Sequence, residues 1–275
     1  MIINNNISSL IASNAISKNE KAMNGSIEKL SSGLRINKAA DDAAGLAVSE
    51  KMRSQIRSLE VAKRNIQDGI SLVQTAEGAM DEVHNMLQRL RELNVQALNG
   101  IYTADDKANL NAEAKQLVQQ INEIANKTNF NGINLLNAGA DVDLQTGIDA
   151  GDKITITAID VKAATILGID LEADPDNIDN VNISAVGFLA TLDTAIQTVA
   201  TNRATLGAIQ NRLEHTLSNV TNYHENLTAS ESAIRDVDMA KEMANYSSKQ
   251  VLLQAGMSIA SQANQKTQMI TKLLG

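Results

Sequence analysis

The chain has 275 residues, with 24 Lys and Arg against 32 Asp and Glu, a formal net charge of −8. This negative balance argues against nucleic acid or an anionic membrane surface as a partner. The absence of cysteine excludes disulfides, thiol catalysis and thiolate zinc sites. Aromatic residues make up only 2%, and Pro175 is the single proline, so the sequence suits long helices joined by thin aliphatic contacts.

The first 30 residues carry a weak helical pattern. A helix this short is marginal alone and needs packing from elsewhere. The segment lacks the basic region and continuous apolar run of a secretory signal, and nothing in the chain is long and apolar enough to span a membrane. A polar, turn-rich link follows at residues 31–42. The apolar positions of the pattern are Ile3, Ile7, Leu10, Ile11, Met23, Ile27 and Leu30.

A long helix is predicted from Ala43 to Leu98, which is 56 residues and about 80 Å at ~1.5 Å per residue. Asp41 and Asp42 stand where side-chain oxygens cap free backbone N–H groups, and Gly100 is a stop signal. A helix of this length needs another long helix beside it. Its apolar positions have the three- and four-residue steps of a helix–helix seam: Ile66, Ile70, Val73, Ala76, Met80, Val83, Leu87 and Leu90.

A second, shorter helix should fold back on the first as a helical hairpin. Thr103 and Asp106 resemble a capping box, with Asp in place of the usual Glu or Gln. Asn131 and Gly132 form a strong turn signal that closes the segment. The predicted seam of this helix consists of Leu110, Ala114, Leu117, Ile121 and Ile124.

The pattern changes in residues 137–183. Apolar residues alternate with polar ones around Val142, and again from Lys153 to Val161, as in half-buried strands. We therefore expect a small antiparallel β-hairpin here. Residues 171–182 form an acidic link that contains the proline.

Helical periodicity returns from Ser184 to Val237, which is 54 residues and nearly the length of the first long helix. Two such helices separated by a hairpin should pack antiparallel. The final stretch, 239–275, repeats the seam more weakly and should meet the N-terminal segment. The seam of the returning helix consists of Leu189, Leu192, Ile196, Val199, Leu206, Ile209, Leu213, Leu217, Val220 and Leu227.

The sequence therefore predicts a mainly α fold: an elongated antiparallel helical rod, coiled-coil-like, with a small β-hairpin region at the middle of the chain. The expected segments are 1–42 and 237–275 as terminal helices, 43–136 and 184–236 as the rod, and 137–183 as the β-hairpin region with the acidic link.

No catalytic residue, metal site or cofactor is predicted. His224 and Glu225 begin a near match to the helical zinc motif H-E-x-x-H, but Thr228 replaces the second histidine. Because positions i and i+4 share a helix face, this threonine removes a metal ligand. Surface histidines on a helix are the simpler interpretation.

Two stretches resemble a known family. LSSGLRINKAADDAAGLAVSEKMRSQIR, which begins at Leu30, is similar to the N-terminal signature of bacterial flagellin. ENLTASESAIRDVDMAKEM, from Glu225 to Met243, and LGAIQNRLEHTLSNV, from Leu206, are similar to its C-terminal signature. The resemblance implies a structural protein without enzymatic activity, which polymerises into the flagellar filament for swimming motility.

The resemblance also implies a location and partners. Flagellins are exported without a cleaved signal peptide and form an extracellular filament. Expected partners are further copies of the chain, an export chaperone at the C-terminal segment, and the filament cap and hook-junction proteins. The residues expected to form the filament-core seam are Ile7, Leu10, Ile11, Met243, Leu253, Met257, Ala260, Ile270 and Leu274.

A further implication concerns the helix around Leu87–Gln96. This segment resembles the flagellin surface that the animal flagellin-sensing Toll-like receptor recognises, and the resemblance falls on Gln88, Arg89 and Leu93, with Glu113 from the next helix. A solvated, ion-paired helix face is the alternative interpretation of the same residues.

Two other functions remain open from the sequence. A hook–filament junction protein would share the terminal helices and would also be structural. A signalling coiled-coil hairpin would share the two long arms, but it would need a membrane span or a receptor link. Electron microscopy of concentrated protein separates the three, because they would give filaments, capped junctions or short rods.

Overall fold

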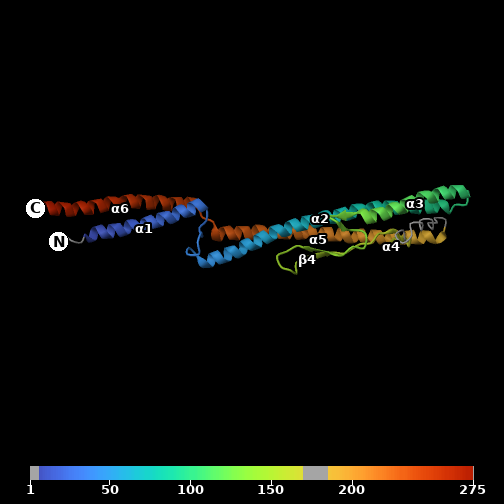
Figure 1. The fold of residues 1–275 in the computed structure, drawn as a ribbon, viewed down its shortest axis with the longest axis horizontal. Helices are drawn as coiled ribbons and strands as arrows, with labels where there is room; N and C mark the ends of the chain where they lie inside the picture. The colour runs from blue at the N-terminus through green and yellow to red at the C-terminus, as the bar shows by residue number, and fades with distance from the viewer. Residues whose placement is uncertain (1–5, 170–184, 275) are drawn as a thin grey trace. The chain divides into compact units, whose positions relative to one another are not determined.

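A computed structural model describes residues 6–169 and 185–274, and it confirms the mainly α class (Figure 1). The acidic link at 171–182 lies outside the described residues. The chain divides into two compact units. We call Met1–Ile56 with Glu225–Gly275 the terminal unit, and Arg57–His224 the central unit. The helices are α1 (Ile7–Ser32), α2 (Ala43–Ala97), α3 (Ala104–Lys127), α4 (Ala163–Leu167), α5 (Val186–Arg235) and α6 (Met239–Leu274).

In the central unit, α2 and α5 run antiparallel. Arg91 near the end of α2 pairs with Asp193 near the start of α5, whereas Glu77, earlier in α2, pairs with Arg203, later in α5. The core residues of α5 recur every seven positions, the repeat of a helix–helix seam. They are Leu192, Val199, Leu206, Leu213 and Val220, and they lie in the same core as Ile66, Val73, Ala76, Met80, Val83, Leu87 and Leu90 of α2.

Some predicted seam positions lie at the flanks of the core rather than inside it. In α3, the fully buried residues include Val118 and Ala125, and the predicted Leu117 and Ile124 are only partly buried. Small buried residues such as Ala114 and Ala125 let α3 pack closely. The larger Leu117 and Ile124 then lie at the edge of the contact. The other partly buried predictions are Ile70, Leu110, Leu189, Ile196, Ile209, Leu217 and Leu227.

The predicted helix starts are confirmed. Asp42 Oδ1 accepts a hydrogen bond from the Gly45 N–H at 2.9 Å, as an N-cap does. Gly45 has to be small here, because a Cβ would lie 2.8 Å from Ile36 Cδ1. Asp41 has a different role, since it accepts hydrogen bonds from the backbone N–H groups of Asn37 and Lys38 in the preceding link.

The Thr103 capping box at the start of α3 gives a first testable expectation. The Asp106 N–H donates to Thr103 Oγ1 at 3.3 Å, and the Thr103 N–H donates to Asp106 Oδ2 at 3.0 Å. Thr103→Ala should lower the free energy of unfolding by roughly 1 kcal/mol, because one backbone donor of the first turn loses its acceptor. Urea unfolding followed by circular dichroism measures this. Thr103→Ser keeps the acceptor and should unfold like the parent; equal loss in both variants would contradict the capping role.

Two small antiparallel hairpins follow α3. Strands β1 (Asn129–Phe130) and β2 (Ile133–Asn134) are joined by Asn131 and Gly132, whose φ angles are 50° and 81°. Strands β3 (Val142–Gln145) and β4 (Lys153–Ile156) form the predicted β-hairpin. The second strand was predicted to reach Val161, but it ends at Ile156. Beyond it the chain pairs elsewhere, since the Val161 N–H donates to the Leu136 carbonyl at 3.1 Å.

The β3–β4 hairpin is attached to α2 at a notch. Gly69 of α2 lies against Leu144 of β3, and a Cβ on Gly69 would come within 2.3 Å of Leu144 Cδ2. The Asn65 side chain donates to the Gln145 carbonyl at 3.2 Å. At the same end of the hairpin, directly after Gln145, the Thr146 N–H donates to the Asp152 carbonyl at 2.8 Å and closes the base of the connecting loop.

Candidate functional site

In the terminal unit, α1 and α6 lie side by side along their lengths (Figure 1). They are antiparallel, because the Asn6 side-chain amide donates to the Ala263 carbonyl at 3.1 Å while Lys249 Nζ donates to Ser26 Oγ at 2.7 Å. Small residues bring the helices together. Gly256 lies directly against Ile16, where a Cβ would be 3.1 Å from Ile16 Cγ1.

Part of the predicted seam of α6 packs within the chain. Leu253 and Ala260 are partly buried on the side that faces α1. The α1 residues that repeat with the same three- and four-residue spacing are mostly small or polar, so the predicted pattern of large apolar side chains included only Met23 and Leu30 of them. These α1 residues are Ser9, Ala12, Ile16, Asn19, Met23, Ser26 and Leu30.

The large apolar residues of this pair point outward instead. On α1, Leu10 is 62% exposed and Ile11 is 63% exposed; on α6, Leu252 is 51% exposed and Ile259 is 60% exposed. Helical spacing places the exposed α6 residues on both sides of its α1-facing stripe. The pair therefore carries uncovered apolar surface on more than one side. The remaining exposed large apolar residues are Ile7 and Ile27 of α1 and Met239, Met243, Val251, Met257 and Met269 of α6.

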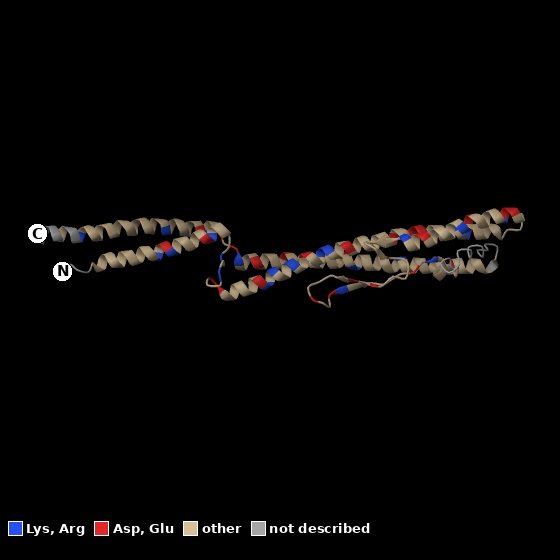
Figure 2. Ribbon diagram, viewed as in Figure 1, with Lys and Arg blue, Asp and Glu red and all other residues tan. Residues whose placement is uncertain are grey.

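Charge is missing from the same part of the pair. Residues 7–17 of α1 and 250–265 of α6 include no Lys, Arg, Asp or Glu. The antiparallel arrangement sets these two segments beside each other, as the tan stretch of α1 and α6 toward the chain ends shows (Figure 2). We call residues 7–17 and 250–265 the apolar band. A surface with exposed Leu, Ile and Met and no charge is typical of a contact with other protein chains.

The other half of the pair is polar and ordered by hydrogen bonds. Ser26 is 1% exposed and accepts from Lys249 Nζ. A hydrogen bond from the Ser26 side chain, together with the nearby Lys249 charge, holds the pKa of Glu242 below its ordinary value. Buried polar contacts of this kind fix the register of two helices, so α1 and α6 have a defined alignment.

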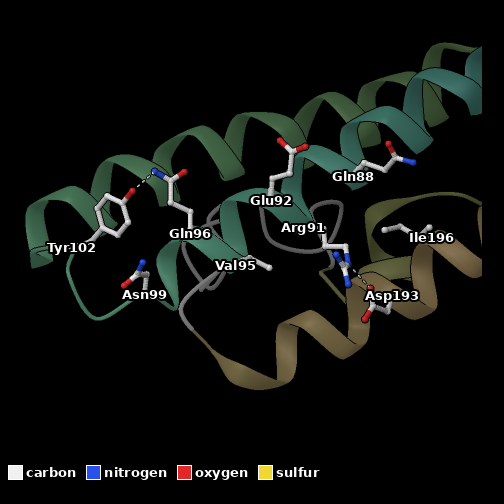
Figure 3. A pocket seen from close by; sticks show the side chains of 9 residues that line it. All are labelled: Gln88, Arg91, Glu92, Val95, Gln96, Asn99, Tyr102, Asp193 and Ile196. Atoms are coloured by element: carbon white, nitrogen blue, oxygen red, sulfur yellow. Dashed lines mark hydrogen bonds and ion pairs between the residues drawn. The ribbon is translucent and has the colours of Figure 1, made fainter.

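The central unit has a groove of about 830 Å³ between the end of α2, the loop to α3 and the start of α5 (Figure 3). Arg91 and Asp193 face each other across it at 2.7 Å, and Gln96 donates to the Tyr102 hydroxyl at 2.9 Å. The charges of Arg91 and Asp193 neutralise each other in this ion pair. The groove therefore has the character of a contact surface and not of a catalytic acid–base site.

A cluster of ion pairs lies on the outer face of α2 near this groove. Arg89 is paired with Glu113 of α3 at 2.9 Å and with Glu92 at 3.1 Å. These hydrogen bonds, first that of Glu113, raise the pKa of the Arg89 guanidinium. Gln88 contacts His84 one turn earlier at 2.8 Å. Exposed pairs of this geometry contribute little to stability, so the cluster is free to change without harm to the fold.

The described residues contain no candidate metal centre and no membrane-spanning helix. Within 6–169 and 185–274, no three His, Cys, Asp or Glu side chains come together as metal ligands would. Among the helices the structure describes, none is both long and apolar enough to cross a membrane.

Comparison with known proteins identifies the family. A model of the bacterial flagellin N-terminal helical region matches residues 3–140, and a model of the bacterial flagellin C-terminal helical region matches residues 189–274. The chain belongs to the bacterial flagellin family. The two family regions contain α1, α2 and α3 with the β1–β2 hairpin, and most of α5 with α6, and they leave out residues 141–188.

Relatives of similar length support this assignment. The chain is 48% identical to a flagellin of Halalkalibacterium halodurans and 45% identical to the flagellar filament 33 kDa core protein of Treponema phagedenis, with 100% of both chains covered in each case. Among solved structures, it resembles the crystal structure of Bacillus cereus flagellin with a TM-score of 0.50 and 36% identity, over 61% of this chain and 94% of that chain.

The structure places the residues suggested by the resemblance to flagellin in two environments, one exposed and one buried. Gln88, Arg89 and Glu113 are exposed and lie close together. Leu93 was expected to be an exposed contact beside Arg89, and this is wrong: its side chain is 0% exposed. Leu93 lies three residues after Leu90 and four before Ala97, which are both 0% exposed, so the helical period places it beside the core. That period was available in the sequence.

The predicted filament-core residues also fall into groups. Ile7, Leu10, Ile11, Met243 and Met257 are exposed, while Leu253 and Ala260 face α1. The side chains of Ile270 and Leu274 lie outside the part of the chain that the structure describes. The role of these residues in a filament stays a prediction.

Proposed function

We propose that the chain is a structural subunit that polymerises into a bacterial flagellar filament and serves swimming motility. One observation carries the proposal: the apolar band exposes Leu10, Ile11, Leu252 and Ile259 with no charge among them. Burying each of these side chains against neighbouring copies contributes ~1.5–3 kcal/mol, and the gain repeats at every subunit. The family's flagellar filament proteins support the same function.

The apolar band also favours an open polymer over a closed pair. Its exposed residues lie on the outer side of α1 and on both sides of the α1-facing stripe of α6. A twofold dimer would cover one such side. Heterologous contacts that do not close generate a helical filament, and several neighbours then cover all sides.

Assembly of the purified chain tests this proposal. The protein is concentrated with short filament seeds and viewed by negative-stain electron microscopy. Long filaments support the proposal. Capped junctions would favour the hook–filament junction alternative, and short rods at every concentration would favour the signalling hairpin.

The location and partners belong to the same proposal. The filament would lie outside the cell, after export without a cleaved signal peptide. The C-terminal segment would bind an export chaperone, and the assembled chain would meet the filament cap and the hook-junction proteins. We propose no enzymatic activity and no cofactor.

We also propose that the monomer is recognised by the host flagellin-sensing Toll-like receptor, through Gln88, Arg89 and Glu113. The support is that all three side chains are exposed, that Arg89 pairs with Glu113 between α2 and α3, and that Gln88 directly precedes Arg89 on α2. Arginine is one of the residue types most often found at interface hot spots. Leu93 has no part in this surface.

A receptor assay tests the second proposal. Arg89→Ala should reduce activation of receptor-expressing cells by the monomer, with an unchanged circular dichroism spectrum. Arg212→Ala, at an exposed position of α5, is the matched control and should signal like the parent. Full signalling with Gln88, Arg89 and Glu113 all replaced would overturn the proposal.

A further inference from the structure

The two connectors of the terminal unit are hydrogen-bonded to each other. Residues 33–42 join α1 to α2, and residues 236–238 join α5 to α6. The Arg35 N–H donates to the Arg235 carbonyl at 2.7 Å, and the Val237 N–H donates to the Gly33 carbonyl at 3.0 Å. The two segments thus form one antiparallel rung, between Leu34 and Asp236.

Arg235 ties this rung to α2. It is the last residue of α5 and only 8% exposed, and its Nη1 lies 2.5 Å from Glu50 Oε1. The hydrogen bond from Arg235 is the main cause that lowers the pKa of the Glu50 carboxyl. Arg35 in turn donates from its guanidinium to the Ile234 carbonyl. Arg235 therefore accepts a hydrogen bond from the first connector through its carbonyl, and it pairs with α2 through its side chain.

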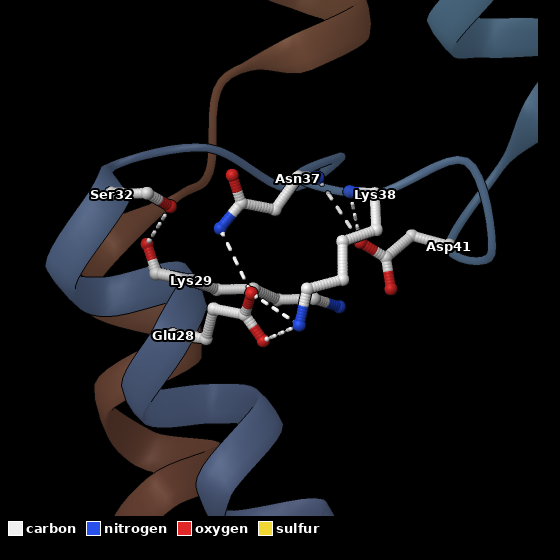
Figure 4. Close-up of polar contacts among 6 residues, drawn as sticks. All are labelled: Glu28, Lys29, Ser32, Asn37, Lys38 and Asp41. Carbon is white, nitrogen blue, oxygen red and sulfur yellow. Dashed lines mark hydrogen bonds and ion pairs between the residues drawn. The ribbon is translucent and has the colours of Figure 1, made fainter.

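The rest of the first connector is held to α1 and to itself. Lys38 pairs with Glu28 at 2.7 Å, the Asn37 side chain donates to Glu28, and Asp41 accepts from two backbone N–H groups of the connector (Figure 4). Ile36 is 1% exposed. The second connector is only three residues long. Both connectors are therefore restrained, the first by these contacts and the second by its short length. A displacement of one connector at the rung should displace the other as well.

We propose that the two connectors form a clasp that opens and closes as a single unit, with Arg235 as its positioning residue. Movement of Arg235 releases the Arg35 N–H and the Glu50 carboxylate together. Loss of that alignment then separates Val237 from Gly33, because the same short rung carries both backbone bonds. The connection between α1 and α2 and the connection between α5 and α6 therefore move together and not independently.

Amide hydrogen exchange of the full chain, read by NMR, tests the proposal. A single opening event exposes both amides, so the protection factors of Arg35 and Val237 should agree within about threefold in the parent. Arg235→Ala should lower both by roughly ten- to a hundredfold, the effect of losing a hydrogen bond to a charged group. Arg53→Ala is the matched control. Arg53 also contacts Glu50, at 3.4 Å, and among the described residues it has no hydrogen bond or ion pair with either connector, so both amides should keep their protection.

A second variant covers the case in which Arg235→Ala disturbs the terminal unit as a whole, seen as lost protection throughout α1 and α6. Glu50 is exposed, so Glu50→Ala should leave those helices intact and still weaken both amides. In the double variant, the protection factors of Arg35 and Val237 should be no lower than in Arg235→Ala alone, since both changes break the same contact. Exchange of Arg35 and Val237 at rates more than about tenfold apart in the parent, or a response of one amide only in Glu50→Ala, would overturn the proposal.

Discussion

A chain with Leu252→Asp and Ile259→Asp is expected to fold like the parent and to form no filaments. Both side chains are exposed in the isolated chain, at 51% and 60%, and surface substitutions usually change stability by less than ~0.5 kcal/mol. In a filament that covers the apolar band, the variant loses ~1.5–3 kcal/mol of burial for each side chain and buries two unpaired charges, which costs more. Circular dichroism melting and seeded assembly viewed by electron microscopy measure the two halves of the expectation.

Two further variants act as controls. Ser247→Asp with Ser248→Asp adds the same charge to exposed positions of α6 outside the apolar band, and we expect these chains to assemble. Ala260→Asp puts a charge on the side of α6 that faces α1, so it should lower the melting temperature of the helix pair itself. Normal filaments from the Leu252→Asp, Ile259→Asp chain would contradict a filament contact at the band.

Leu93→Ala is expected to lower the free energy of unfolding by ~2–5 kcal/mol, the usual result of deleting a fully buried leucine. Leu93 is 0% exposed in the central core. Arg89→Ala, only four residues earlier in the sequence, should change it by less than ~0.5 kcal/mol, because the Arg89 side chain is 49% exposed and its ion pairs are screened by water. Urea unfolding followed by circular dichroism distinguishes the two.

The same pair of variants separates a receptor contact from a structural effect. If Leu93→Ala loses receptor activation, the loss should recover at low temperature or in a stabilising osmolyte, where the fold is restored. The loss caused by Arg89→Ala should persist under those conditions. A Leu93→Ala chain with parental stability would show that the leucine is not a core residue.

The periodicity of the sequence was sufficient to predict where the long helices begin and end. The first was predicted over 43–98 and is observed over Ala43–Ala97; the second was predicted over 184–237 and is observed over Val186–Arg235. Such long repeats average out local irregularities, and the caps at Asp42 and Thr103 mark the starts by chemistry that is visible in the sequence.

The same pattern was less informative about which face packs against which partner. In α1, the residues in contact with α6 are mainly small or polar, such as Ala12 and Ser26, while Leu10 and Ile11 point outward. A pattern of large apolar residues does not show whether a helix face packs within the chain or against another chain. Both kinds of contact use an apolar stripe along one helix. Leu253 illustrates the difference, since it faces α1 although its neighbour Leu252 is exposed.

The site residues were predictable to the extent that they depend on helical phase. Leu93 follows the seam residue Leu90 by three positions, which favours the core, but it also follows the exposed Arg89 by four, so helical phase alone does not separate the two. The rung between the connectors could not be predicted, because it joins residues about 200 positions apart in the sequence and depends on one arginine among many.

The attachment of the β3–β4 hairpin has a practical consequence. Leu144 in the Gly69 notch and the Asn65 hydrogen bond to Gln145 anchor its loop end on α2, and the adjacent Thr146–Asp152 hydrogen bond holds the ends of the loop together. A foreign peptide placed between residues 147 and 151 would therefore start and finish at nearly the same point, without interrupting a helix. Each doubling of such an insert should cost only ~0.6 kcal/mol in loop closure. The loop between β3 and β4 is thus a position from which this chain could display a grafted epitope or enzyme tag.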